Sequence, residues 1–139
     1  MSELRHPRGL ADTGVVIDLE KIEPADLPVE VAISAVTLAE LAAGPHADTD
    51  REERARRQDR LQRAEATFEV FPFDTAAARA YGRIYATVLA AGRKARGRRA
   101  LDLLIAATAV SAGLPLYTRN PEDFDGLDGL DDLVEIVAI

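Results

Sequence analysis

Hydrophobic residues follow two patterns that alternate along the chain. Short apolar stretches predict strands, and the longer segments between them, with apolar residues three and four apart, predict helices. The strand segments are 9–11, 29–33, 68–71, 116–118 and 134–137, and the helix segments are 15–19, 35–43, 51–67, 75–91 and 101–112. Strands that alternate with helices predict an α/β fold in which a central parallel sheet is flanked by α-helices as an α/β/α sandwich. We expect one domain over residues 1–139.

The segment 101–110 is apolar on nearly every face, which predicts a helix buried in the core. Asp102 is its one ionisable residue. An unpaired buried carboxylate is energetically costly or takes up a proton, so Asp102 needs a partner. This segment alone leaves two interpretations open, because Asp102 is either the N-cap of the helix or part of a polar site.

The composition narrows the class of protein. With 139 residues, 47% of them hydrophobic, the chain is long enough to bury a core. It contains no cysteine, so disulfides and thiolate metal sites are excluded. Its N-terminal residues do not resemble a signal peptide, and no apolar stretch is long enough to cross a bilayer. We therefore expect a cytoplasmic protein without a membrane partner.

The net charge of −7 argues against a general nucleic-acid binder, whose phosphate contacts need Lys and Arg. The charge is unevenly distributed, however. Five of the seven residues 93–99 are Lys or Arg, directly before the segment that contains Asp102, whereas 122–135 is strongly acidic. The basic segment is therefore a candidate phosphate-binding element within an acidic protein.

Several acidic and amide residues fall where an α/β fold collects its sites. Asp12 follows the first predicted strand, and Asn120 and Asp123 follow a later one. Glu40 interrupts an apolar helix, and Asp102 interrupts the buried one. Carboxylates gathered at one sheet edge repel one another unless a cation neutralises them. Because neither histidine occupies these positions, the ligands are hard oxygens, which favour Mg2+ or Mn2+. A metal of this kind beside a basic segment is a common arrangement for phosphodiester cleavage.

Four motifs, in this order, resemble those of PIN-domain ribonucleases, and more narrowly those of the VapC toxins of VapBC toxin–antitoxin systems. They are LADT at 10–13, ISAVTLAEL at 33–41, DLLIAA at 102–107 and TRNPEDF at 118–124. The resemblance covers essentially the whole chain and implies a PIN-like domain. It also implies a Mg2+- or Mn2+-dependent endoribonuclease that forms a homodimer. A VapB antitoxin would inhibit the enzyme by laying its C-terminal segment across the active-site groove.

The resemblance implies roles for individual residues as well. Asp12, Glu40 and Asp102 match the three near-invariant acids that hold the metal. Thr13 and Thr118 match small hydroxyl positions that support the metal ligands. These five residues are thus expected to meet in one catalytic site.

The fourth acidic position differs from the simplest family pattern. The family often has Asp where this chain has Asn120, and we predict that Asp123, three residues later, supplies the missing charge. Mg2+ tolerates ligands that act through water, so an indirect contribution from Asp123 would suffice. In the basic segment, Arg96, Arg98 and Arg99 are predicted to bind the phosphate oxygens of RNA.

A second function remains open. A PIN-like module with weakened or lost catalysis would bind RNA or a protein partner without cleaving RNA. Asn120 is the feature that favours this alternative. A metal-dependent cleavage assay discriminates between the two functions.

Overall fold

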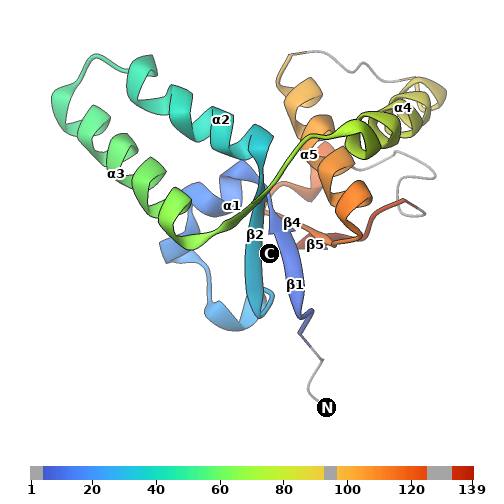
Figure 1. Cartoon of the computed structure of the whole chain (residues 1–139), viewed down its shortest axis with the longest axis horizontal. Helices are drawn as coiled ribbons and strands as arrows, with labels where there is room; N and C mark the ends of the chain where they lie inside the picture. Colours follow the sequence, from blue (N-terminus) through green and yellow to red (C-terminus); the bar gives the residue numbers. More distant parts are fainter. Residues whose placement is uncertain (1–4, 93–96, 125–132) are drawn as a thin grey trace.

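The computed structural model describes residues 5–92, 97–124 and 133–139, and its centre is a parallel sheet (Figure 1). Its strands are β1 (Arg8–Ala11), β2 (Glu30–Ser34), β3 (Glu69–Phe71), β4 (Leu116–Thr118) and β5 (Ile136–Ala138). They lie in the order β3-β2-β1-β4-β5, and every neighbouring pair is parallel. The predicted parallel α/β fold is confirmed.

The helices fill the connections between the strands. They are α1 (Thr13–Ile17), α2 (Ala35–Ala43), α3 (Arg51–Thr67), α4 (Thr75–Ala90) and α5 (Arg98–Ala112), with short 3-10 turns η1 (Leu19–Lys21), η2 (Pro24–Asp26), η3 (Gly44–Ala47) and η4 (Pro121–Asp123). The bounds predicted for α2 and α3 agree with the structure. In Figure 1 the α2–α3 pair lies on one side of the strands, and the α4–α5 pair lies on the other.

Four of the helices begin at a side chain that caps the backbone. In each, the capping oxygen accepts a hydrogen bond from the N–H three residues further on. The caps are Asp12 for α1, Ser34 for α2, Asp50 for α3 and Asp74 for α4. A cap of this kind stabilises a helix by about 1 kcal/mol. The local sequence therefore fixes where these helices start.

The helix α5 begins before the segment expected from the apolar pattern. Its N-cap is Gly97, with φ +62°, and its C-cap is Gly113, with φ +68°. Asp102 lies in the second turn, so the interpretation of Asp102 as the N-cap is wrong. The basic residues Arg98 and Arg99 are good helix formers and continue the helix beyond its apolar part. Although α5 is largely apolar, neither it nor any other described helix is long and apolar enough to span a membrane.

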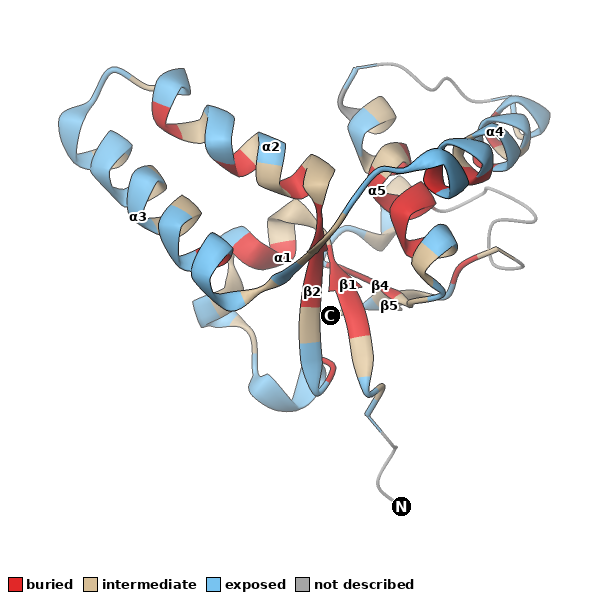
Figure 2. Cartoon of the chain, viewed as in Figure 1, coloured by how far each residue is buried: buried red, intermediate tan, exposed pale blue. Residues whose placement is uncertain are grey.

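The two faces of the sheet bury two separate cores. Successive strand residues point to opposite faces, so Leu10 of β1 packs with Ile84 and Leu103 on the α4–α5 side, whereas Ala11 packs with Val15 on the α1–α3 side. Figure 2 shows the buried residues concentrated in the strands and along α5. The fold is thus the predicted α/β/α sandwich, with helices covering both faces.

Candidate active site

The sheet contains a point at which the chain winds in opposite directions. From β1 the chain proceeds to β2 and β3 on one side, whereas β4, on the other side of β1, leads to β5. In parallel sheets, ligands bind outside the carboxyl ends of the strands at such a switch point. Asp12 follows β1 and Asn120 follows β4, and these two strands are direct neighbours through Ala11 and Tyr117. The topology therefore brings both residues to the same edge.

Asp12 is fixed at this edge by its role as the cap of α1. Its Oδ1 accepts a hydrogen bond of 2.9 Å from the Val15 N–H. Burial raises the pKa of Asp12 above the ordinary aspartate value, and the negative charges of Asp123 and Glu40 raise it further. Hydrogen bonds to the Thr118 side chain and the Val15 N–H lower the pKa and offset part of this rise. Negative charge from three separate elements thus converges on this edge.

Glu40 is held from the other side by hydroxyl groups. The Thr13 Oγ1 lies 2.6 Å from Glu40 Oε1 and donates to it, so the first residue of α1 orients a carboxylate of α2. The same Thr13 oxygen lies 3.1 Å from the Thr37 Oγ1, which is fully buried. Thr13 and Glu40 are themselves only half-buried, which leaves the carboxylate accessible. The contacts agree with the supporting role proposed for Thr13 on the basis of the motifs.

The residues after β4 complete the edge. Thr118 is fully buried, and its Oγ1 accepts a 3.0 Å hydrogen bond from the Asn120 N–H. Because this oxygen accepts from Asn120, the Thr118 hydroxyl proton is available for its hydrogen bond to Asp12. A Cβ added at Gly14 would lie 3.5 Å from the Asp12 Oδ1 and 3.8 Å from the Asn120 Nδ2. The side chains of Asp12 and Asn120 therefore both reach the first turn of α1.

Asp123 approaches the edge from the α5 side. The Arg99 guanidinium donates a 2.7 Å hydrogen bond to the Asp123 carbonyl, which ties η4 to the first turn of α5. Asp102 is half-buried and comes three residues after Arg99, so the two side chains share a face of the helix. Arg99 thus has a positioning role that the sequence did not reveal, because its hydrogen bond is made to a backbone carbonyl of a distant segment.

Two of the predicted phosphate ligands cannot be placed at this edge. Arg96 lies outside the described residues, and the side chain of Arg98 is likewise not described, although its backbone begins α5. Two further polar residues were not expected from the sequence to belong to the site. They are Thr37 and Ser34, both fully buried and linked to Thr13 by hydroxyl contacts. Their spacing, S-x-x-T at the start of a helix, is a capping signal and indicated no more than a cap.

The donor set fits a hard divalent cation. Carboxylate and hydroxyl oxygens are the ligands that Mg2+ and Mn2+ prefer, and they are the atoms that line this edge. Burial, and then the negative charges of Asp123 and Glu40, raise the pKa of Asp12, and a cation bound beside it would favour its ionised form. Among the described residues, no three carboxylate or imidazole side chains are already gathered at ligand distance around one point. A cation would therefore need to draw the side chains of the site closer together.

Comparison with known protein families identifies the family of this chain. A family model of the PIN domain matches residues 10–130, which include Asp12, Glu40, Asp102 and Asp123. The chain belongs to the PIN-domain family. The family predicted from the four motifs is therefore confirmed, as is the α/β fold.

Individual relatives narrow the family further. Ribonuclease VapC5 of Mycobacterium tuberculosis is 38% identical to this PIN-domain chain over 134 residues, which cover 94% of this chain and 95% of the relative. Ribonuclease VapC8 of Mycobacterium tuberculosis is 40% identical over 102 residues, which cover 73% of this chain and 89% of the relative. The crystal structure of VapBC-5, a toxin–antitoxin system of Mycobacterium tuberculosis, superposes with a TM-score of 0.82 at 38% identity and covers 96% of this chain and 99% of that one.

These likenesses confirm two expectations about activity. The chain is a homologue of the VapC ribonucleases, and it is an enzyme of the hydrolytic PIN-domain class. Metal dependence is a general property of these nucleases.

Proposed function

We propose that this PIN-domain protein is a Mg2+- or Mn2+-dependent endoribonuclease toxin. Its metal ligands are Asp12, Glu40 and Asp102, with Asp123 in the fourth acidic position. The observation that supports this proposal most strongly is the position of Asp12 at the switch point of the sheet, beside the strand that leads to Asn120, where burial raises its pKa and the charges of Asp123 and Glu40 raise it further. A fold that gathers carboxylates in this way gains by binding a divalent cation there.

The residues of the chain prepare this site before a cation binds. The α1 backbone and Thr118 hold the Asp12 carboxylate, and Thr13 orients Glu40 through its 2.6 Å hydrogen bond. Arg99 fixes the turn that carries Asp123. When bound, the cation supplies positive charge at the scissile phosphate and increases the acidity of the attacking water.

We propose that phosphate is bound by the basic segment 93–99, whose last two residues begin α5. Arg99 contributes by holding η4, and we propose that Arg96 and Arg98 contact the RNA backbone directly. The position of Arg99 at the acidic edge supports this assignment, because it places the start of α5 beside the site. The substrate would therefore lie between the acids and the basic segment.

A VapB-type antitoxin is the proposed protein partner, since the structure of VapBC-5 that resembles this chain is that of a toxin–antitoxin system. A groove of about 320 Å3 between α1, η1 and α3 supports this proposal. Its lining includes the apolar residues Val16, Ala64 and Phe68 together with charged residues of both signs, which are Arg56, Arg60, Arg63, Glu20 and Asp59. An amphipathic segment fits such a lining, and the excess of arginine favours acidic residues in that segment. Because Asp12 caps the helix that bears Val16, the groove and the acidic edge share α1.

A homodimer is proposed on the resemblance and on exposed apolar side chains. Tyr85 and Leu89 of α4 are 43% and 56% exposed, and Leu101 of α5 is 39% exposed. Side chains of this type are those that a second copy would bury. We further propose that the domain spans residues 1–139 and acts in the cytoplasm, for which the absence of cysteine is compatible with reducing conditions.

A cleavage assay on circular RNA tests the proposal. A circle has no ends, so only an endonuclease can cut it. The wild-type protein should linearise the circle with Mg2+ or Mn2+ and not with EDTA, and Asp12→Asn should abolish cleavage. Glu135→Gln, at the opposite edge of the sheet, is the matched control and should cleave normally. Binding of RNA without metal-dependent cleavage would contradict the proposed nuclease.

A further inference from the structure

Three hydroxyl groups lead from the core to the Glu40 carboxylate. The Ser34 Oγ lies 3.3 Å from the Thr37 Oγ1, and the Thr37 Oγ1 lies 3.1 Å from the Thr13 Oγ1. The chain of hydroxyls ends at Glu40, whose Oε1 is 2.6 Å from the Thr13 Oγ1. Ser34 and Thr37 have no exposed surface, so water does not compete for the hydrogen bond between their hydroxyls.

The number of protons fixes the direction of these hydrogen bonds. An ionised carboxylate can only accept, so the single hydroxyl proton of Thr13 points to Glu40. The hydrogen bond between Thr13 and Thr37 then needs the Thr37 proton, and the hydrogen bond between Thr37 and Ser34 needs the Ser34 proton. The Ser34 Oγ meanwhile accepts a 2.9 Å hydrogen bond from the Thr37 N–H. Every hydroxyl donates once and accepts once, and the donors run from Ser34 outward to Glu40.

We propose that Thr37 is a positioning residue of the active site, which locks the Thr13 hydroxyl toward Glu40 by donating to it. This inference rests on the proposed function, because it concerns how Glu40 is prepared for a divalent cation. Without the Thr37 proton, the Thr13 hydroxyl and its rotamer are free to turn, and Glu40 loses its orienting partner. Hydrogen bonds in such a buried chain of hydroxyls also polarise and strengthen one another.

Valine and serine substitutions separate orientation from packing. Thr37→Val keeps the shape of the side chain and removes its hydroxyl, whereas Thr37→Ser keeps the hydroxyl. Thr108→Val is the matched control, because Thr108 is equally buried and its Oγ1 donates to the Leu104 carbonyl within α5. Thr37→Val should weaken Mn2+ binding roughly tenfold, the range found for groups that orient metal ligands. Thr37→Ser and Thr108→Val should bind Mn2+ as the wild type does.

The Thr13→Val background tests whether Thr37 acts through Thr13. Adding Thr37→Val to Thr13→Val should weaken Mn2+ binding no further, because the group that Thr37 orients is already missing. Additive losses, or Mn2+ affinity of Thr37→Val equal to that of the wild type, would overturn the positioning role. Calorimetry with Mn2+ alone measures all of these affinities.

A measurement on the metal-free protein keeps this inference distinct from the proposed function. Three-bond NMR couplings report the χ1 rotamer of Thr13 without metal or RNA. Wild type, Thr37→Ser and Thr108→Val should show one rotamer, and Thr37→Val should show an average over several. A single Thr13 rotamer in Thr37→Val overturns the inference whether or not the wild type binds Mn2+. Failure of the wild type to bind Mn2+ or to cleave RNA, with the rotamer change present, contradicts only the proposed function.

Discussion

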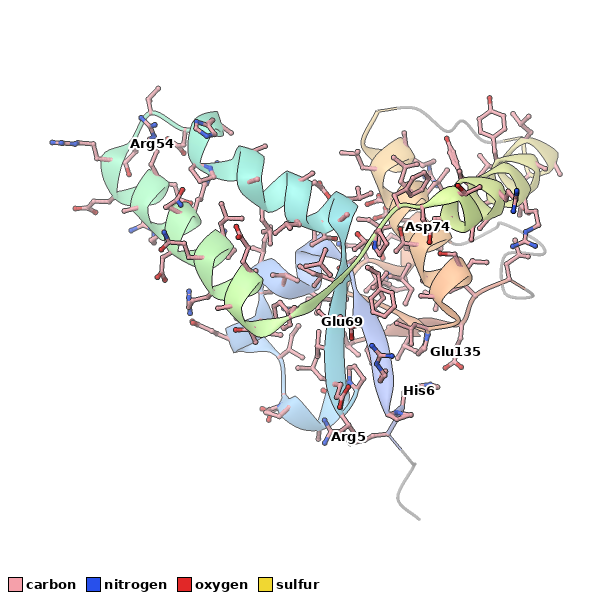
Figure 3. The ribbon with its side chains drawn as sticks, viewed as in Figure 1. Arg5, His6, Arg54, Glu69, Asp74 and Glu135 are labelled. Atoms are coloured by element: carbon pink, nitrogen blue, oxygen red, sulfur yellow. The ribbon has the colours of Figure 1, made fainter. Side chains whose placement is uncertain are left out.

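Carboxylates at the two edges of the sheet have different partners. We call the edge at which the parallel strands begin the amino edge, and the edge at which they end the carboxyl edge. At the amino edge, acids have basic partners: Arg8 contacts both Glu30 and Glu69, and the His6 Nε2 lies 2.9 Å from the Glu135 Oε2. Figure 3 shows His6 and Glu135 close together at this edge. At the carboxyl edge, Asp12 is held instead by a hydroxyl and a backbone N–H, with Asp123 and Glu40 near enough to repel it.

The difference shows what each edge is adapted to do. Exposed ion pairs such as those at the amino edge each contribute at most about 1 kcal/mol to the stability of the fold. At the carboxyl edge, burial and then the charges of Asp123 and Glu40 raise the pKa of Asp12, so its ionised form should reduce the stability of the metal-free protein. Active sites that bind a cation commonly hold carboxylates whose pKa values are shifted in this way.

The largest expected effect is a loss of RNA cleavage, which should follow substitution of acids at the carboxyl edge and not at the amino edge. Asp12→Asn, Glu40→Gln and Asp102→Asn should each lower RNA cleavage by about a thousandfold or more, and the effects should not add, because the acids act as one unit. Single-turnover cleavage measures this, with Glu135→Gln of the amino edge as the unaffected control. Wild-type cleavage by Glu40→Gln would place Glu40 on the surface of α2 and outside the site.

The fourth acidic position provides the next comparison, within the carboxyl edge itself. Asp123→Asn should slow cleavage more than Asn120→Ala, because Asp123 supplies charge near Asp12 and Asn120 supplies none. The cleavage rates of both variants are measured at saturating Mn2+ and again at low Mn2+, where the loss of rate in Asp123→Asn should be greater. The reverse order would make Asn120 the direct ligand.

Salt dependence sharpens the role of the basic segment. Replacing Arg96, Arg98 and Arg99 by Ala should weaken RNA binding for all sequences alike. It should reduce the slope of log affinity against log salt by roughly one for each phosphate that the variant no longer neutralises. Arg99→Ala alone should also reduce cleavage, because it releases the turn that bears Asp123. An unchanged slope in the triple variant would remove the phosphate-binding role.

The smallest effect is expected at the amino edge. Glu135→Gln removes the partner of His6, and since both side chains are substantially exposed, the free energy of unfolding should fall by less than about 1 kcal/mol. Chemical denaturation at pH 6 measures the change. A loss of several times this size would mean that the amino edge is a stabilising network and not a set of independent surface pairs.

Much of this arrangement could be predicted from local sequence, and the rest depends on distant contacts. The caps at Ser34 and Asp74 follow from residue types and spacing, as does the stop at Gly113, whereas the sequence around Asp12 predicts only a turn. The start of α5 could not be placed correctly, because Arg98 and Arg99 extend the helix without adding to its apolar pattern. The contacts of Thr13 with Thr37 and of Arg99 with the Asp123 carbonyl depend on how separate elements pack, which no local pattern records.

The pH dependence of stability tests the raised pKa of Asp12, which is caused by burial and then by the charges of Asp123 and Glu40. A carboxyl group with a raised pKa binds its proton more tightly in the folded protein. The resulting stability is present below the ordinary aspartate pKa, about pH 4, and is lost as pH rises through the folded pKa. Asp12→Asn keeps a capping side chain and removes the charge. Metal-free wild type should therefore lose stability relative to Asp12→Asn above about pH 4.

Denaturation of these two proteins from pH 4 to pH 8, with and without Mn2+, is the most direct measurement of the central claim. At about a hundred times its dissociation constant, Mn2+ should stabilise the wild type by roughly 2.7 kcal/mol at neutral pH. It should thereby offset the loss of stability above pH 4, and it should stabilise Asp12→Asn far less. Parallel pH curves for the two metal-free proteins, together with an equal response to Mn2+, would contradict the claim that the carboxyl edge gathers its acids around a cation.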